Sequence, residues 1–295
     1  MTHPRRTPRV RRRVRCLKQE GRTFRLSLLD FYALAIYLAA EMVLAAFQTS
    51  IYQPQGQRNL SYTPEFIADL DRTISRARLA RFMTAAGGNI ELALHLYEKN
   101  LELSEALFGL LHGLEIAVRN SIHHVLSVDI GRQDWYRDGH PLPFPAVHIL
   151  SFTRPMNSMI TDARSNAGTG APVGKVIAEL TFGFWPNMIT SRFEDLWRAS
   201  LNKAFPSAHV PRKLVHWRLE TIRRLRNRIA HHEAILTSRN QVYTGFIDQP
   251  TMTLPAILEC VTWVSPPTAD WLRTTTRYPQ ATTLLAEVAD SGVVI

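Results

Sequence analysis

The sequence has little cysteine and few alternating, strand-like runs. Its 295 residues include two cysteines, Cys16 and Cys260, which lie far apart without a CxxC pair. This excludes a disulfide framework and a thiolate metal site, and it is compatible with a reducing cytoplasm. The segment 241–247, QVYTGFI, is the main strand-like exception. A hydrophobic content of 45% is enough for a core and excludes disorder throughout.

Net positive charge is also scarce outside the N-terminal arm. Residues 1–26 hold ten basic side chains and one acidic side chain, Glu20, so nine of the ten net positive charges lie there. The rest of the chain carries a net charge of only +1. The high isoelectric point therefore belongs to the arm, and any RNA contact in the folded part must come from local clustering.

The arm is followed by an apolar stretch, residues 26–47. Asp30 and Glu41 interrupt it, and its uncharged run lasts only from Phe31 to Ala40, whereas a bilayer span needs about 20 apolar residues. Three interpretations stay open: a helix packed on the domain, a membrane anchor, which is not favoured, or sequence upstream of a natural start at Met42.

A polar segment at 51–64, IYQPQGQRNLSYTP, has the composition of a linker. We therefore expect residues 1–63 to comprise the arm, the apolar stretch and the linker. Residues 64–295 are expected to form one helical domain.

From Pro64 onward, apolar residues recur at helical spacing, and the predicted fold class is all-α. Asn89 is placed to cap a helix after Gly87 and Gly88. Loops rich in Gly and Pro are expected at 129–145 and 166–174. The expected helices are 66–83, 91–100, 101–128, 146–164, 174–181, 187–204, 212–236, 252–263, 267–276 and 279–288.

The segment 225–236, LRNRIAHHEAIL, places polar groups in an apolar-periodic helix. At about 100° per residue, Arg226 falls near the middle of a core stripe. A buried arginine needs a carboxylate, a subunit neighbour or a bound phosphate. Asn227 and His231 share another face, and Arg223 precedes Asn227 by one turn. The stripe is made by Val215, Leu219, Ile222, Leu225 and Ile229.

A second segment, LEIAVRNSIHHVL at 114–126, contains a similar Arg-Asn-His pattern. Glu115 lies at the edge of its apolar stripe, so we expect it to pair with Arg226 if the two helices pack. Structural or surface roles are expected for His123 and His124. A metal site could in principle combine these two histidines with His231, His232 and Glu233, but adjacent histidines point to different helix faces, and this alternative is not favoured.

Arg226, four intervening residues and His231 resemble the R-x(4–6)-H signature of HEPN domains, helical modules many of which are RNases. Five blocks in order resemble the Abi-like (abortive infection) family of bacterial phage-defence proteins. They cover about residues 66–275, whereas Lys99, Pro186 and residues 1–60 depart from the family pattern. The blocks are ISRARLARFM (74–83), ALHLYEKNLELSEALFGLLHGLEIAVRNSIHHVL (93–126), IAELTFGFWPNMI (177–189), FEDLWRASLNKAFP (193–206) and LRNRIAHHEAIL (225–236).

The resemblance implies a HEPN-like helical bundle with additional helices and an N-terminal extension, and metal-independent RNA cleavage by attack of the 2′-hydroxyl. His231 would act as base or acid and Arg226 would bind phosphate oxygens. Asn227 would orient His231, and His232 would be a second proton carrier or a structural residue. Supporting roles are expected for Glu115, Arg119 and Asn120, and an RNA contact for Arg223.

The resemblance also implies a homodimer, an RNA substrate, and an RNA or protein antitoxin in a phage-defence or toxin-antitoxin system. Neither a cofactor nor a metal is expected. The alternative is a non-catalytic RNA-binding or protein-interaction module on the same fold, and membrane contact through residues 26–47 is not favoured. For FGFWPNM at 182–188, core packing is favoured over base stacking.

Overall fold

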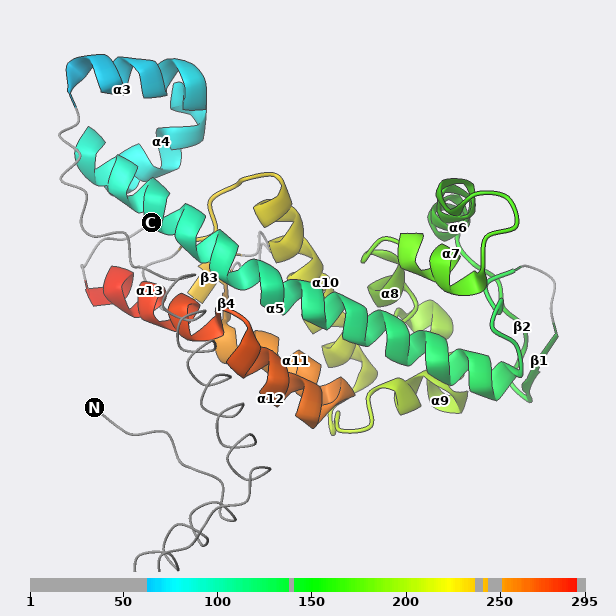
Figure 1. Cartoon of the computed structure of the whole chain (residues 1–295). Coiled ribbons are helices and arrows are strands. Elements are labelled where there is room, and N and C mark those ends of the chain that lie inside the picture. Colours follow the sequence, from blue (N-terminus) through cyan, green and yellow to red (C-terminus); the bar gives the residue numbers. More distant parts are fainter. Residues whose placement is uncertain (1–62, 138–140, 237–240, 244–250, 291–295) are drawn as a thin grey trace, which may run out of the picture. The chain divides into compact units, whose positions relative to one another are not determined.

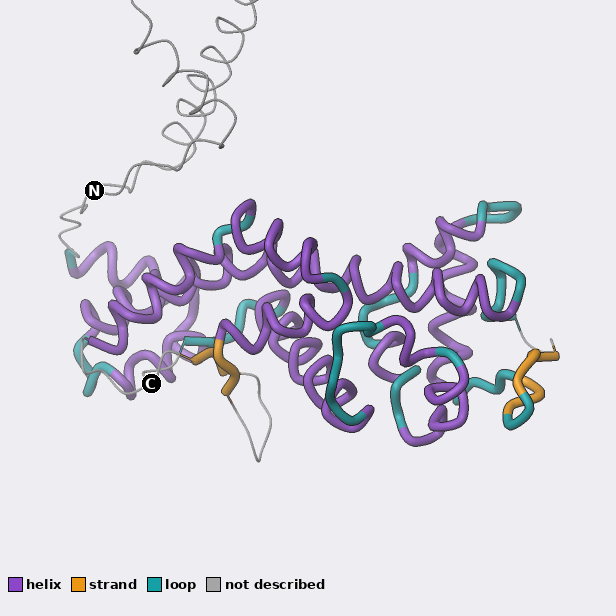
Figure 2. The backbone as a smooth tube through the Cα atoms, turned by 90° about the horizontal axis from the view of Figure 1, so that it is seen from below, coloured by secondary structure: helices purple, strands orange, loops and turns teal. Residues whose placement is uncertain are grey.

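A computed structural model describes residues 63–137, 141–236, 241–243 and 251–290. They belong to one compact unit, Tyr62–Ile295, which is described here by itself. Helices dominate it and confirm the all-α prediction (Figures 1 and 2). The expectations for the arm, the apolar stretch, Met42 and most of the linker fall on residues outside the described part of the chain.

The described helices follow the sequence pattern closely at most positions. A π-helical segment, Asp71–Ser75, joins the first two, and short 3-10 turns at Ser191–Phe193 and Leu201–Ala204 flank α9. The helices are α3 (Pro64–Leu70), α4 (Arg76–Ala85), α5 (Ile90–Ile130), α6 (Arg154–Ala167), α7 (Val173–Glu179), α8 (Phe184–Asn187), α9 (Glu194–Ala199), α10 (Arg212–Ala230), α11 (Leu254–Val264), α12 (Pro266–Thr275) and α13 (Tyr278–Asp290).

Helix α5 is the central element of the unit. Two predicted helices, 91–100 and 101–128, are one helix of 41 residues. The Asn89 side chain accepts from the Leu92 N–H at 3.0 Å, as the sequence predicts, and Gly131 ends the helix with a left-handed φ of 75°. A continuous buried face runs from Ala93 to Leu126, and each fully buried aliphatic side chain there contributes about 1.5–3 kcal/mol.

Helices pack along the whole length of α5. Helix α4 and α13 contact it, as do α10, α11 and α12 (Figure 1). At Gly113 a Cβ atom would lie 2.4 Å from Cδ2 of Leu272, so the close approach of α12 depends on the missing side chain. The α6 and α7 helices pack on each other and lie over the C-terminal half of α5.

Two short antiparallel strand pairs lie outside the helices (Figure 2). Strands β1 (Pro141–Phe144) and β2 (Val147–Ile149) occupy residues predicted as loop and as the start of a helix. The helix predicted from residue 146 therefore begins only at Arg154. Strand β3 (Gln241–Tyr243) agrees with the strand-like run at its first three residues, and 244–247 lie outside the described residues. Its partner β4 (Thr251–Thr253) takes the first two residues of the helix predicted over 252–263, which begins at Leu254 instead.

The helix predicted over 187–204 is wrong as a single element. Thr190 has an extended backbone, with ψ 166°, before the 3-10 turn that precedes α9. Ser200 then leaves the helical region, with φ −146°, and is fully buried. The apolar periodicity continues through this region because each short helical segment packs one face against the core. The backbone nevertheless leaves the helical conformation at Thr190 and again at Ser200.

The FGFWPNM segment forms core structure, as expected. Phe184 and Trp185 are 0% exposed. Trp135 lies between them and His123: its ring centroid is 6.3 Å from that of Phe184, and its indole N–H donates to His123 Nδ1 at 3.0 Å. Neither Phe184 nor Trp185 is available to stack on a base.

Among the described residues, no helix has the length and apolar character needed to cross a membrane.

A buried amide joins α5 to the chain that follows α10. Asn100 is 2% exposed, and its Oδ1 accepts the N–H groups of Ile235 at 2.7 Å and Leu236 at 3.1 Å. Both of these residues are 0% exposed, so water cannot replace the acceptor. One side chain therefore satisfies two buried donors from a segment 135 and 136 residues away in the sequence.

We expect Asn100→Ala to destabilise the fold by about 2–5 kcal/mol, because each buried N–H left without an acceptor costs about 1–3 kcal/mol. Denaturant unfolding measures this change. Asn166→Ala is the control, since Asn166 is exposed near the end of α6, and it should shift stability by less than about 0.5 kcal/mol. If both variants lost the same free energy of unfolding, the stabilising role of the Asn100 hydrogen bonds would be contradicted.

Candidate functional site

Helix α10 ends inside the Arg-Asn-His segment. The prediction of helix to residue 236 is wrong for its last six residues, because α10 stops at Ala230. The N–H of Glu233 donates to the Arg228 carbonyl at 2.8 Å, and that of His232 to the Ile229 carbonyl at 3.0 Å. This pair of bonds is the Schellman motif, which turns the chain sharply out of a helix.

The turn places His232 in an unusual backbone conformation. Its φ is 57°, in the left-handed region where Gly is usual at this position of the motif. A residue with a side chain loses about 1–2 kcal/mol there. Strain of this kind persists only where the surroundings hold it, and it is often found at functional sites.

Three side chains hold this turn. Arg78 of α4 donates from Nη1 to the carbonyls of His231 at 3.2 Å and His232 at 2.6 Å. Arg228 donates from Nη2 to the Ala234 carbonyl at 2.8 Å and pairs with Glu233. Asn100 fixes the two residues that follow. The positive charges of Arg78 and Arg228 also lie at the C-terminal end of α10, where they interact favourably with the negative end of the helix dipole.

The start of α10 is fixed as well. Arg212, its first residue, is paired with Glu194 and donates from Nη1 to the carbonyl of Ile189. Because both ends of α10 are held by side chains from other elements, the residues along it have a defined position relative to α5.

Arg226 contacts Glu115, as expected, but it is not buried. Its Nε lies 3.6 Å from the Glu115 Oε2, and the two side chains are 44% and 18% exposed. The prediction that Arg226 is buried is therefore wrong. The stripe itself is confirmed, because all five of its predicted residues are buried, as is Thr221. Position 226 is open to solvent although it lies between them in angle.

The two histidines of the motif are both exposed, and Asn227 is half-buried. Within the described residues, neither imidazole has a hydrogen-bond partner. His231 follows Arg226 by five residues, which corresponds to about 140° around the axis of a helix, and the structure contains no bond between them. The two groups are thus accessible on different sides of one helix end, with no hydrogen bond between them within the described residues.

Arg223 is already paired. Its Nε and Nη2 donate to both carboxylate oxygens of Glu220, at 2.7 and 2.6 Å. Burial raises the pKa of Glu220, but hydrogen bonds from Arg223 and Arg224 outweigh it, so the pKa lies below its usual range. A phosphate would have to compete with this carboxylate, and the RNA contact at Arg223 stays a prediction.

From the second Arg-Asn-His segment, Glu115 contacts the end of α10. Arg119 donates from Nε to Asn120 Oδ1 at 3.2 Å, and Asn120 faces a groove beside α12. His123 accepts from Trp135, and burial, together with the charge of His124, lowers its pKa. Supporting roles of Arg119 and Asn120 in the same site stay predictions.

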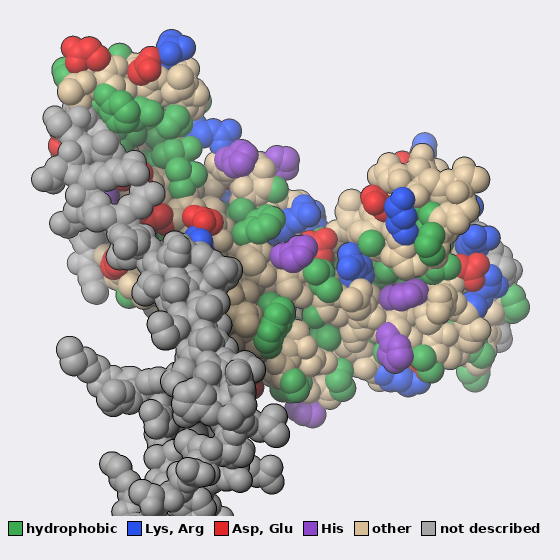
Figure 3. All heavy atoms as spheres, in the orientation of Figure 1, with side chains coloured by type: hydrophobic (Ala, Val, Ile, Leu, Met, Phe, Trp, Pro, Cys, Tyr) green, Lys and Arg blue, Asp and Glu red, His purple; other side chains and the backbone are tan. Residues whose placement is uncertain are grey.

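The sequence does not favour a metal site at these histidines. Across the described ranges, no three His, Cys, Asp or Glu side chains are grouped to hold an ion. Basic and acidic side chains are interspersed on the face shown in Figure 3, together with several histidines. This agrees with the near-neutral charge of the chain beyond its arm.

Sequence reasoning missed two residues, Arg78 and Asn100. Both lie in blocks that resemble the family, and Asn100 is a polar residue on the buried face of a helix. A polar side chain at a core position signals a partner, but the sequence does not say which segment supplies it.

The sequence matches the family model described as Abi-like protein over residues 61–237. The chain belongs to this family, and membership suggests a function of the abortive-infection type. The match ends directly after Leu236, so it includes the whole turn and the three residues whose side chains hold it. Neither the curated proteins nor the solved structures contain a match.

We expect Arg78→Ala to loosen the turn by about 1 kcal/mol, because charged hydrogen bonds to two helix-end carbonyls are lost. Amide hydrogen exchange over residues 231–236 should become severalfold faster. Arg72→Ala is the control, since its exposed pair with Asp69 lies within the same N-terminal helical region and contributes little. Unchanged exchange in the Arg78 variant would show that the turn does not depend on this contact.

Proposed function

We propose that this protein is an RNA endonuclease of a phage-defence or toxin-antitoxin system, with a HEPN-type site at the end of α10. The main support is the anchored turn, which presents His231 and His232 to solvent at the end of the helix that also carries the exposed Arg226. The Abi-like family of the chain and its R-x4-H spacing support the same function. Cytoplasmic action fits the scarcity of cysteine.

The proposed reaction uses the RNA as its own nucleophile. A base takes the proton of the 2′-hydroxyl, the oxygen attacks the adjacent phosphorus, and an acid protonates the leaving 5′-oxygen. Imidazoles titrate near neutral pH and can perform either proton transfer, so His231 takes one role and His232 is the candidate for the other. Asn227, one turn before His231, would orient it.

Arg226 would stabilise the charge that develops on the phosphate oxygens. Its contact with Glu115 is long, at 3.6 Å, and involves Nε, so its terminal nitrogens can bind an oxyanion. Glu115 would then position the guanidinium without binding RNA itself.

A homodimer is part of the proposal. Arg226 and His231 lie on different sides of one helix end, so a phosphate bound by Arg226 needs a histidine from elsewhere or a shared cleft. Two copies facing each other would bring the arginine of one chain to the histidine of the other. An RNA or protein partner would cover this cleft until the system is triggered.

The second candidate is a non-catalytic RNA-binding or protein-interaction module. It is favoured by the pairing of Arg223 with Glu220 and by the absence of a bond between Arg226 and His231 in the described chain. The same residues would then bind a partner without proton transfer.

Activity of purified variants separates these functions. We expect His231→Ala to lower RNA cleavage about 10²- to 10⁴-fold, and Arg226→Ala to lower it about 10²- to 10³-fold, with unchanged melting temperatures. Expression of either variant should no longer inhibit bacterial growth.

Two exposed residues of the same types, His209 and Arg154, serve as matched controls. Alanine variants at these positions should retain cleavage within about twofold. If the His231 and Arg226 variants fold and cleave as the wild type does, the proposed catalytic site is wrong, whereas RNA binding without cleavage in the wild type supports the second candidate.

A further inference from the structure

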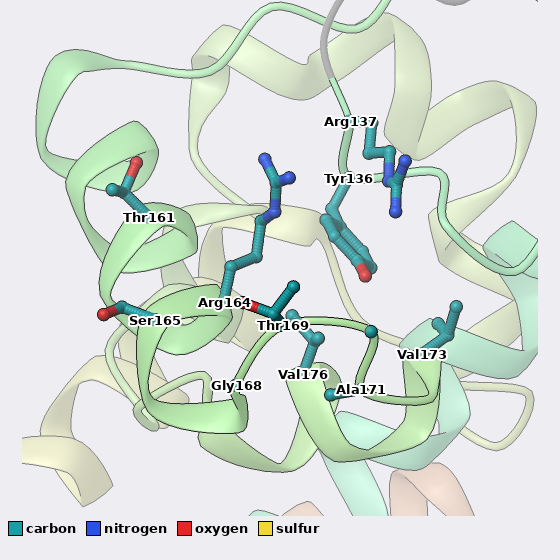
Figure 4. Close-up of a pocket in the computed structure, with 11 residues that line it drawn as sticks. Tyr136, Arg137, Thr161, Arg164, Ser165, Gly168, Thr169, Ala171, Val173 and Val176 are labelled. Carbon is teal, nitrogen blue, oxygen red and sulfur yellow. The ribbon is translucent and has the colours of Figure 1, made fainter.

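A cavity of about 460 Å³ lies between the end of α6, the loop to α7 and the segment after α5 (Figure 4). Its size falls in the range of small-molecule sites, about 300–1,000 Å³. Arg78 of α4 marks the position of His231, whereas α6 and α7 lie over the other half of α5 (Figure 1). The cavity is therefore separate from the proposed cleavage site.

The lining contains two arginines and no carboxylate. Arg164 extends from α6 into the cavity toward Tyr136 (Figure 4), and its guanidinium has no hydrogen bond or ion pair within the described residues. Arg137 pairs through Nε with Asp134 at 3.2 Å and also has a side-chain hydrogen bond with Tyr136. Two guanidinium groups thus border one cavity with only one carboxylate partner between them.

The hydroxyl of Tyr136 also lies at this cavity. Burial raises its pKa and the charge of Asp134 acts in the same direction, while the charges of Arg137 and Arg164 and a hydrogen bond with Arg137 act against them. The hydroxyl can donate a hydrogen bond to a bound anion, in addition to the charged donors of the arginines.

The loop between α6 and α7 adds small residues and backbone donors to the cavity. Gly168 and Gly170 have φ values of 91° and 75°, which a residue with a side chain would adopt only under strain. A Cβ atom at either position would meet nothing within 4 Å, so open space lies beside the loop. Within the described residues, the N–H groups of Thr169 and Gly170 have no acceptor.

We infer that this cavity binds the phosphoryl group of a nucleotide-sized ligand. Guanidinium groups bind phosphate oxygens through several donors at once, and the absence of a lining carboxylate avoids repulsion. The same chemistry is found in a free nucleoside monophosphate and in the 5′-phosphorylated end of an RNA. The site is independent of the proposed cleavage reaction and would sense or anchor such a phosphate.

Calorimetric titration of the full chain with the four ribonucleoside 5′-monophosphates tests the first source. We expect at least one of them to bind at least tenfold more tightly than its unphosphorylated nucleoside. Arg164→Gln should weaken that binding at least tenfold, because it removes the charge at an exposed position and leaves the fold intact. Arg154→Gln, at the exposed start of the same helix, should bind within twofold of the wild type.

A short RNA with a 5′-phosphate or a 5′-hydroxyl tests the second source, with His231→Ala in all chains to prevent cleavage. Arg164-dependent preference for the phosphorylated end supports the site even if no mononucleotide binds. The inference is overturned if neither class of probe shows a phosphate preference, or if Arg164→Gln and Arg154→Gln bind equally. Either result leaves the cleavage proposal unaffected, since that proposal is tested by activity.

Discussion

The side-chain oxygen of Asn100 accepts the N–H groups of Ile235 and Leu236 in the core of the unit, at 2.7 and 3.1 Å. This interaction fixes the chain immediately after the turn that ends α10. Without it, two buried donors would lose their acceptor, and the turn would have no fixed position relative to α5. Arg78 of α4 also donates hydrogen bonds to the carbonyls of the two histidines. These contacts therefore fix the position of the exposed polar residues at the end of α10 relative to the core.

A catalytic or binding site requires side chains that are held in fixed positions, because much of the rate or affinity that they provide comes from their positioning. The strained backbone of His232 belongs to the same arrangement, since the surrounding bonds compensate for it. The cavity beside Arg164 is built differently: its charges come from the ends of α6 and of the segment after α5. The two phosphate sites that we propose therefore lie in separate places, one exposed and one recessed.

Much of the fold could be predicted from apolar spacing. The buried face of α5, its Asn89 cap and the contact between Glu115 and Arg226 all follow from helical periodicity and charge pairing. Periodicity failed where the backbone turns but the apolar pattern continues, as at Thr190 and at the end of α10. The exposure of Arg226 was missed because the core face of a helix depends on which neighbours cover each turn. Contacts such as Arg78 to His231 join distant segments and leave no local signal.

The chemical nature of the cleavage products tests the central claim most directly. Wild-type protein should be incubated with end-labelled RNA in excess chelator, and the new ends should be identified by their susceptibility to phosphatase and kinase. The account predicts fragments that end in a 2′,3′-cyclic phosphate and begin with a 5′-hydroxyl. Intact RNA, or fragments with a 5′-phosphate that form only when a divalent cation is added, would contradict it.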